Sequence, residues 1–437
     1  MNEFEIDTVR GRRVWDSRGR PTVEVCVALR SGVTGRAIAP AGASRGAREA
    51  LDLRDGGDAL DGLDIGTATR RVNTDIASEL KGRDVLDQRG IDAALIALDG
   101  TLARSRLGGN AMVATSLATL HAAAAASQVP LWRHLADSYG RTPSVPLPEI
   151  QIFGGGAHAG RRVDVQDFMI MVPGASNLDE VMEVTAEVYH AAGSLMRAGG
   201  RLAGVADEGG WWPMFDSNEE ALETLVRAIE TVGERPGERV AISLDIAASE
   251  FADGDGYRLA LEDRQLDSEA LIELLGRWID AYPIVSVEDP VAETDHAGMV
   301  EFTRRYGERV QVVGDDYLVT KAELVHEAAA ADACNATLVK VNQVGTVSES
   351  IDTIEAAEAH GYRCLVSARS GETEDVSVSH LAVGLDAGQL KVGSFSRSER
   401  MAKWNECLRV QDELGSAAFV GGRPLRDTWW GQQRAGR

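Results

Sequence analysis

Six short apolar segments in the second half of the chain share one pattern: each ends at a polar or charged residue, and helical periodicity follows. Their end residues recur at intervals of 22 to 43 residues, a spacing typical of successive strand–helix units. In a β/α barrel the carboxyl ends of such strands meet at one mouth, where the active site lies. We therefore expect an α/β fold with a barrel whose mouth gathers Asp245, Glu288, Asp315, Lys340, Arg369 and Lys391.

The first part of the chain has a different pattern. Residues 21–29 alternate apolar and polar side chains and are rich in β-branched residues, which predicts a strand. A glycine-rich loop at 39–46 follows it. Helical patterns then cover residues 90–102 and 110–126. This mixture indicates an α+β domain ahead of the barrel.

A proline cluster separates the two patterns. Pro143, Pro146 and Pro148 interrupt regular structure and mark a domain boundary. We expect a smaller α+β domain at residues 1–140 and a β/α barrel at residues 141–437.

The charge balance excludes some classes of partner. The 437 residues include 45 basic and 68 acidic side chains, which gives a net charge of −23. Proteins that bind nucleic acids or anionic membrane surfaces usually present a basic field, so we expect neither activity. A local basic pocket for a small phosphorylated molecule remains compatible with this composition.

The cysteines and the first ten residues indicate the cellular compartment. Cys26, Cys334, Cys364 and Cys407 form no CxxC pair and are scattered, which predicts free thiols in a reducing compartment. The first ten residues lack the apolar core of a signal peptide. The longest run of small apolar residues is too short to span a bilayer. We expect a cytoplasmic protein that does not enter the membrane.

Three of the expected strand ends carry acids. Asp245, Glu288 and Asp315 would supply hard oxygen ligands on a rigid frame, which suits Mg²⁺. Without a cation, three converging carboxylates would repel one another. One acid at a strand–helix junction more often caps the helix, but three acids with two lysines at equivalent positions favour a metal site.

The remaining strand ends are basic. Lys340 and Lys391 each follow an apolar run, which makes a pair of surface lysines the weaker interpretation. A buried lysine near other cations can lose its proton and act as a base. Arg369 and Ser370 begin the segment RSGETED, and a guanidinium beside a hydroxyl is well suited to a phosphate group.

Several segments, in matching order, resemble signatures of the enolase family over essentially the full length of the chain. They are Asp16–Gly19 with Pro21–Glu24, Gly42–Ser44, Glu49–Leu51, Asp207–Gly210, Ser286–Asp289, Val339–Gly345 and Ser370–Asp375. The resemblance implies an enolase-type C-terminal β/α barrel, a smaller α+β N-terminal domain, two Mg²⁺ ions and a homodimer or higher homo-oligomer.

The resemblance also implies a role for each matching residue. Asp245, Glu288 and Asp315 correspond to ligands of the first Mg²⁺. Ser44, on a mobile loop, corresponds to a ligand of the second, which also contacts the substrate phosphate. Lys340 corresponds to the base that removes the C2 proton of 2-phosphoglycerate, and Glu208 to the acid that helps hydroxide leave. The substrate-binding residues implied in this way are His158, Asp167, Arg369, Ser370 and Lys391.

Other positions depart from the family pattern. The histidine that precedes the phosphate-binding arginine is replaced by Ala368, and the glutamate of a Gln-Glu-Phe motif by Asp167. Arg45 lies in the mobile-loop segment, Arg161 and Arg162 follow His158, and Trp211 and Trp212 follow the acid.

These departures allow two interpretations. The arginines could hold a second anionic substrate, and Trp211 could stack on the base of a cytidine nucleotide conjugate. Alternatively, the arginines belong to a solvated loop and the tryptophans to a pocket wall or an interface.

Three functions remain open at this point. Intact metal ligands with an altered leaving-group side favour a carboxyphosphonoenolpyruvate synthase, which joins 2-phosphoglycerate with CMP-activated phosphonoformate in phosphonate antibiotic biosynthesis. The alternative is phosphopyruvate hydratase, the glycolytic enolase that converts 2-phosphoglycerate to phosphoenolpyruvate. A non-catalytic enolase-fold binding protein is the third, and the retention of Lys340 and Glu208 speaks against it.

Overall fold

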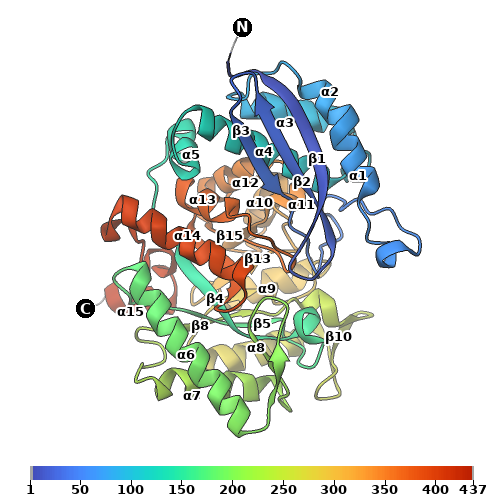
Figure 1. The fold of residues 1–437 in the computed structure, drawn as a ribbon. Helices are drawn as coiled ribbons and strands as arrows, with labels where there is room; N and C mark the ends of the chain where they lie inside the picture. The colour runs from blue at the N-terminus through green and yellow to red at the C-terminus, as the bar shows by residue number, and fades with distance from the viewer. Residues whose placement is uncertain (1–2, 436–437) are drawn as a thin grey trace.

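A computed structural model of the chain describes residues 3–435, so the outer limits expected for the two domains, residues 1 and 437, lie outside the described residues. Figure 1 shows the N-terminal sheet and its helices at one end of the molecule and the barrel at the other. The domain boundary at 140/141 stays a prediction. The chain leaves its first set of helices at α5 (Leu131–Tyr139) and enters the barrel at β4 (Leu147–Gly154).

An antiparallel meander of three strands opens the chain. It has the order β1 (Ile6–Trp15), β2 (Pro21–Leu29) and β3 (Thr34–Ile38). The strand predicted at 21–29 is thus confirmed. Short segments and four helices follow: η1 (Ala59–Gly62), α1 (Gly66–Arg71), η2 (Val72–Ile76), α2 (Ala77–Leu80), α3 (Gln88–Asp99) and α4 (Gly109–Ala126).

Helix α4 packs closely against the meander. It is buried on nearly all sides, as expected for a helix that is apolar all round. Gly35 of β3 lies so near to it that a Cβ there would come within 2.3 Å of the Ala118 carbonyl oxygen. The alanine-rich sequence of α4 permits this approach because small side chains leave the backbone accessible.

Eight strands close into a barrel, in which β16 pairs with both β15 and β4. Every residue of these strands is buried except the half-buried Arg363, because side chains fill the interior and helices cover the outside. In chain order the strands are β4, β5 (Asp167–Met171), β8 (Ala241–Asp245), β12 (Ile284–Glu288), β13 (Gln311–Gly314), β14 (Ala336–Val339), β15 (Arg363–Ser367) and β16 (Gly388–Ser394).

Two features of the barrel differ from a simple series of strand–helix units. Strand β5 runs antiparallel to both of its neighbours, β4 and β8, because no crossover helix separates it from β4. The proline cluster also extends into regular structure. Pro148 is the second residue of β4, near the strand end where a proline is tolerated.

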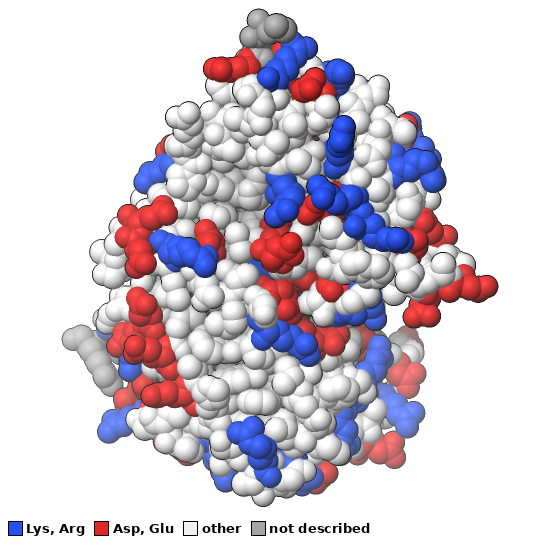
Figure 2. Space-filling model, viewed as in Figure 1, with Lys and Arg blue, Asp and Glu red and all other residues white. Residues whose placement is uncertain are grey.

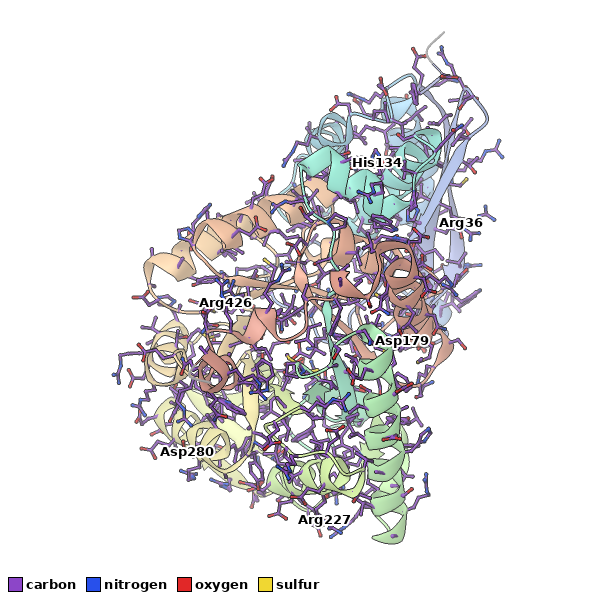
Figure 3. All side chains as sticks on the ribbon, turned by 90° about the vertical axis from the view of Figure 1, so that its left-hand side faces the viewer. Arg36, His134, Asp179, Arg227, Asp280 and Arg426 are labelled. Carbon is purple, nitrogen blue, oxygen red and sulfur yellow. The ribbon has the colours of Figure 1, made fainter. Side chains whose placement is uncertain are left out.

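Helices surround the barrel, and Figure 1 shows α6 and α7 along its lower side. The helices of this region are α6 (Leu178–Ala198), α7 (Asn218–Thr231), α8 (Ser268–Ala281), α9 (His296–Tyr306), α10 (Ala322–Ala330), α11 (Val341–Val344), α12 (Val347–Ala359), α13 (Ser377–Gly384), α14 (Ser398–Leu414) and α15 (Trp429–Ala435). In Figure 3 the labelled Asp179, Arg227 and Asp280 lie on α6, α7 and α8.

Smaller elements decorate the barrel. A hairpin of β6 (Leu202–Val205) and β7 (Trp211–Pro213) joins the edge of β4, and β9 (Ala252–Asp253), β10 (Gly256–Leu259) and β11 (Arg264–Leu266) form a separate small sheet. The short helices are η3 (Gly156–Ala159), η4 (Ala248–Phe251), η5 (Ser416–Ala418) and η6 (Arg423–Leu425).

The surface and the cysteines agree with the composition. Figure 2 shows acidic and basic side chains interspersed on the face in view. All four cysteines are free thiols, as predicted. Among residues 3–435, no helix combines the length and the apolar character that a membrane crossing requires.

Candidate active site

A cleft with about 320 Å³ of empty space lies where the N-terminal domain meets the carboxyl ends of the barrel strands. The lining residues come from both domains. They are Ser44, His158, Gln166, Asp167, Glu208, Asp245, Lys340, Ser367, Ala368, Arg369, Ser370, Lys391, Val392 and Gly393. The cleft therefore brings together most of the residues that the sequence singled out.

Lys391 binds two of the expected metal ligands. Asp245 and Glu288 end neighbouring strands and stand opposite each other in register. The Lys391 Nζ lies 2.9 Å from Asp245 Oδ2 and 2.8 Å from Glu288 Oε2. All three side chains are buried. A positive charge thus already occupies the space between these two carboxylates.

The third expected ligand pairs with the other lysine. Asp315 follows β13, Lys340 follows β14, and the Lys340 Nζ donates a hydrogen bond to Asp315 Oδ2. Burial disfavours the ammonium, but the carboxylates led by Asp315 outweigh it and raise the pKa of Lys340. Lys340 is therefore a protonated ion-pair partner of Asp315 here, and a role as a base would require Asp315 to release it.

Three buried acids in or directly after the barrel strands have raised pKa values. Burial, followed by repulsion from Asp245, raises the pKa of Glu288 well above its ordinary value. Burial and Asp315 raise the pKa of Asp316 to about 8, and burial raises that of Glu149 to about 7. Such upward shifts mean that the ionised acids lack compensating positive charge.

This imbalance fits a divalent cation. The donors at the strand ends are carboxylate oxygens, the ligands that Mg²⁺ prefers, and the ammonium of Lys391 already stands in for a cation between two of them. A second group, Asp289, Asp315 and Asp316, has ligand atoms within 4.8 Å of one another and shares Asp315 with the expected set. The residues present therefore suit the metal that the sequence predicts.

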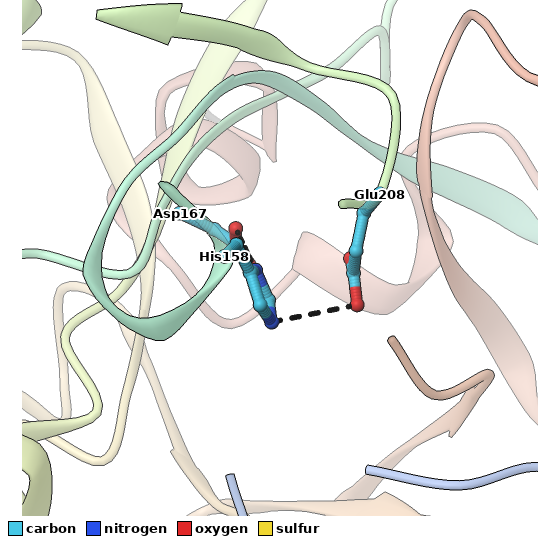
Figure 4. Close-up of side chains that lie close together, drawn as sticks. All are labelled: His158, Asp167 and Glu208. Carbon is cyan, nitrogen blue, oxygen red and sulfur yellow. Dashed lines mark hydrogen bonds and ion pairs between the residues drawn. The ribbon is translucent and has the colours of Figure 1, made fainter. Parts of the chain in front are cut away.

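His158 lies between two carboxylates, as Figure 4 shows. Its Nδ1 is 3.2 Å from Asp167 Oδ1 and its Nε2 is 3.6 Å from Glu208 Oε1. Burial opposes the charged ring, but Glu208 and Asp167 outweigh burial and raise the pKa of His158 to about 9. The pKa of Glu208 is lowered, since His158 more than offsets its burial. The proton of this cluster therefore resides on His158 at neutral pH.

Arg369 and Ser370 also line the cleft. Ser370 Oγ is 3.1 Å from His158 Nε2, so the hydroxyl connects the arginine segment to the histidine. The Arg369 guanidinium is buried and pairs with Glu49, with 2.9 Å between Nη1 and Oε2. It also donates from Nη2 to the backbone carbonyl of Ser44. This places the expected phosphate-binding residues against the expected loop ligand.

Ala368 leaves an apolar stretch of wall. It follows β15 and lines the cleft together with Val392 and Gly393 of β16. A methyl group offers no hydrogen bond, so this part of the cleft cannot donate to a leaving group. Polar groups that line the same cleft include the His158 ring and the Ser370 hydroxyl, which lie 3.1 Å apart.

The three additional arginines lie outside the lining of this cleft. Arg161 pairs with Glu250 at 2.6 Å, and Arg162 lies 3.8 Å from Asp216. Arg45 is exposed on the loop and borders a smaller pocket beside Glu49. Two of these cations thus already have acidic partners on the protein surface.

Trp211 packs against residues of its own domain. Its ring stacks on Tyr189 with 4.5 Å between the centroids and an angle of 19°. Its indole N–H donates to the Tyr189 carbonyl at 2.8 Å, and the Arg197 guanidinium lies 5.6 Å from the ring. These contacts place the residue in the packing of α6 against the β6–β7 hairpin.

Sequence reasoning missed several residues that support the site. Asp289 accepts the backbone N–H groups of Asp315 and Asp316, and it occurs in a motif that suggested no role for it. Gln343 donates to Asp315 Oδ1 at 2.9 Å. Gln166 donates to Asp245 Oδ2 at 3.0 Å. Asp289 and Gln166 directly adjoin a predicted residue and Gln343 lies three positions after Lys340, and this closeness in sequence is the signal that could have identified them.

Comparison with known proteins gives two family matches along the chain. The family described as "Enolase, N-terminal domain" matches residues 6–135, and "Enolase, C-terminal TIM barrel domain" matches residues 142–428. A relative named "Enolase 1", from Desulfitobacterium hafniense (strain Y51), is 46% identical over 421 residues, which cover 96% of each chain.

Proposed function

Since this chain belongs to the enolase family, we propose that it is a phosphopyruvate hydratase, which removes water from 2-phosphoglycerate to form phosphoenolpyruvate. One observation carries the proposal: two buried lysines that line the cleft pair with acids at three neighbouring strand ends, and Arg369 lines the same cleft. That arrangement suits the removal of a proton beside a carboxylate in a phosphorylated substrate.

We propose that Asp245, Glu288 and Asp315 hold one Mg²⁺ and that Ser44 contributes to a second. When bound, these ions would stabilise the extra negative charge that develops on the substrate carboxylate. The chain itself supplies the frame, because the acids are fixed at strand ends and their neighbours Gln166, Gln343 and Asp289 hold them through hydrogen bonds.

Lys340 is the proposed base at C2 of the substrate. Its Nζ is buried beside Asp315, where bulk water has little access to the proton that it takes up. Lys391 remains protonated in this account, since Asp245 and Glu288 offset its burial and raise its pKa well above the ordinary value. It would therefore bind the substrate carboxylate rather than compete as a base.

The leaving hydroxyl needs a proton, and His158 carries one. Its Nε2 faces Glu208 and Ser370 across the cleft, while Asp167 orients the ring through Nδ1. We propose that the His158–Glu208 pair, rather than Glu208 alone, delivers this proton. The arrangement would let the hydroxyl leave although Ala368 removes the histidine expected at that position.

Several observations favour the hydratase over the synthase that the sequence departures first suggested. Arg161 and Arg162 have acidic partners, and Trp211 is stacked on Tyr189. Two of the three cations expected for a cytidine conjugate, and the aromatic surface, are therefore engaged elsewhere. A relative that is 46% identical and carries the name of an enolase gives further support.

Steady-state turnover of 2-phosphoglycerate with Mg²⁺, followed through the ultraviolet absorbance of phosphoenolpyruvate, tests the proposal. A hydratase forms this product without any second substrate, and CMP-activated phosphonoformate leaves the rate unchanged. A synthase forms a new phosphorus-containing product only when both substrates are present, which would overturn the proposal. A protein that neither turns over nor binds 2-phosphoglycerate would support a binding role instead.

Assembly and location remain proposals. We propose a homodimer, as the family resemblance implies, and light scattering coupled to gel filtration would test it. The free thiols favour the cytoplasm.

A further inference from the structure

We propose that Glu49 is a positioning residue that couples the loop at residues 41–48 to the phosphate-binding fork of Arg369. The proposal rests on the proposed function only in taking Arg369 as the phosphate ligand. Glu49 belongs to the N-terminal domain, and its buried carboxylate contacts Arg369 at the end of a barrel strand. One side chain thus joins the loop to the barrel.

The Glu49–Arg369 pair is bidentate. Arg369 Nη1 lies 2.9 Å from Glu49 Oε2, and Nη2 lies 3.2 Å from Oε1. The side chains are 3% and 4% exposed, so water screens the pair little. Paired donors and acceptors of this kind fix the orientation of a guanidinium as well as its position. Glu49 therefore determines which way the Arg369 fork faces.

The remaining Nη hydrogens of Arg369 are also engaged. Nη1 donates to Asn342 Oδ1 at 3.1 Å, and Nη2 donates to the Ser44 carbonyl at 2.9 Å. A guanidinium offers four Nη hydrogens, so a phosphate oxygen that approaches this fork must replace one partner. The Ser44 carbonyl is the replaceable one, because Glu49 carries charge and Asn342 stands on the barrel. Phosphate binding would therefore displace the loop.

Glu49 holds the loop as well as the arginine. Its Oε1 accepts the Gly46 backbone N–H at 3.1 Å, and its own N–H donates to the Gly46 carbonyl at 3.2 Å. Gly42 provides an independent sign of close contact, since a Cβ at that position would lie 2.0 Å from Arg369 Nη2. The loop backbone thus lies directly against the guanidinium, and only glycine allows this approach.

A third connection leads from Glu49 to the proposed metal ligands. Gln343 Nε2 lies 3.3 Å from Glu49 Oε1 and 2.9 Å from Asp315 Oδ1. After Glu49, the carboxylates that act most strongly on Arg369 are Asp315 and Asp316. Without the charge of Glu49, the guanidinium would be drawn toward Asp315. Glu49 thereby keeps the phosphate-binding cation apart from the acid expected to bind metal.

The test replaces Glu49 by glutamine, which keeps the shape of the side chain and removes its charge. The matched control is Glu349→Gln, because Glu349 forms an ion pair with Arg104 that also joins the two domains, away from the cleft. Two measurements are made on the full chain. Kinetics with 2-phosphoglycerate give KM and kcat, and trypsin reports the loop through cleavage after the exposed Arg45 and Arg48.

We expect Glu49→Gln to raise KM by about tenfold, because an ion pair becomes a weaker bond between the charged guanidinium and a neutral amide, and to change kcat less. Cleavage after Arg45 should accelerate by a similar factor. Glu349→Gln should change neither quantity, and Glu49→Asp should lie between Glu49→Gln and the unmodified protein. Unchanged KM and cleavage in Glu49→Gln, or equal changes in Glu349→Gln, would overturn the proposal.

A second variant covers the case in which Glu49→Gln does not fold. Gly42→Ala adds a Cβ against Arg369 and should raise KM and loop cleavage in the same direction, whereas unchanged values would contradict the coupling. Inorganic phosphate separates this inference from the hydratase proposal. In an unmodified protein without hydratase activity, phosphate should still change the rate of cleavage after Arg45, and Glu49→Gln should reduce that response. An identical response in both proteins would overturn the inference alone.

Discussion

The base side of the cleft, defined here as Lys340 and Lys391 with their acids, stands on parallel strand ends. The acid side, defined as His158, Asp167 and Glu208, stands on η3, on the antiparallel strand β5 and on the turn between β6 and β7. Strand ends are fixed by the pairing of the whole sheet, whereas loops can change without disturbing the core. Among the departures from the family pattern, Asp167 belongs to the acid side, and Arg161 and Arg162 follow His158. Ala368 instead follows the parallel strand β15, where its backbone N–H donates to the Lys391 carbonyl, and Arg45 lies on the loop at 41–48.

The comparison shows where this protein can vary. Each residue on the base side has a buried partner of opposite charge, so a single change would leave a charge uncompensated. On the acid side, the loss of the histidine at Ala368 leaves a cluster in which His158 already holds a proton between two carboxylates. Under the proposed function, proton delivery would therefore survive a substitution that proton removal would not tolerate.

Replacement of Lys340 by alanine should have the largest effect. We expect C2 proton exchange and product formation to fall by about 10²–10⁴-fold, since a positioned base contributes that much. Exchange is measured by the loss of the C2 proton signal in D₂O. Arg304→Ala, on an exposed face of α9, serves as control. A variant that still exchanges the C2 proton at the normal rate would show that Lys340 is not the base.

Restoring a donor on the acid side should have the next largest effect, and in the opposite direction. We expect Ala368→His to increase product formation by about tenfold or more, because proton transfer to the leaving hydroxyl gains a second donor. C2 exchange should change little. Ala368→Leu fills the same space without a donor, so equal rates in the two variants would contradict this explanation.

The pKa of His158 predicts a dependence of stability on pH. Its folded-state pKa of about 9 exceeds the ordinary value of 6.5, so its ion pairs stabilise the fold fully below about pH 6.5. This stabilisation, on the order of 3 kcal/mol, is lost as pH rises through about 9. Urea unfolding across this range measures it. His158→Gln should flatten the alkaline decline, and an unchanged slope would mean that other groups cause it.

Trp211→Phe should have the smallest effect on activity. Because the indole stacks on Tyr189 and bonds to its carbonyl, the change should lower the free energy of unfolding by about 1 kcal/mol. KM and kcat should stay within about twofold, since Trp211 is outside the residues that line the cleft. A large rise in KM would instead indicate that Trp211 contacts the substrate.

The same division explains what could be predicted from the sequence. The strands that end at Asp245, Glu288 and Val339 were visible because buried parallel strands form short apolar runs bounded by polar residues. The pattern did not reveal β4 and β5, since a proline lies in the first and no helix separates the two.

The partners within the site were harder to predict. The pairing of Lys391 with Asp245 and Glu288, and of Arg369 with Glu49, depends on how distant segments meet. Arg161 and Trp211 were unusual residues in the sequence. Their partners could not be recognised there, because Glu250 is distant from Arg161 along the chain and Tyr189 belongs to no motif. Local patterns predict where side chains lie along a strand. Tertiary contacts determine which charged side chains are paired within the protein and which remain available to bind a ligand.

The central claim is that this cleft both removes the C2 proton and expels the hydroxyl without a second substrate. It is tested most directly by following 2-phosphoglycerate with the protein and Mg²⁺ in D₂O by ¹H and ³¹P NMR. We predict that phosphoenolpyruvate accumulates with 2-phosphoglycerate as the only substrate. Deuterium entering at C2 without phosphoenolpyruvate would contradict the claim, because the base side would then work while the acid side waits for another substrate.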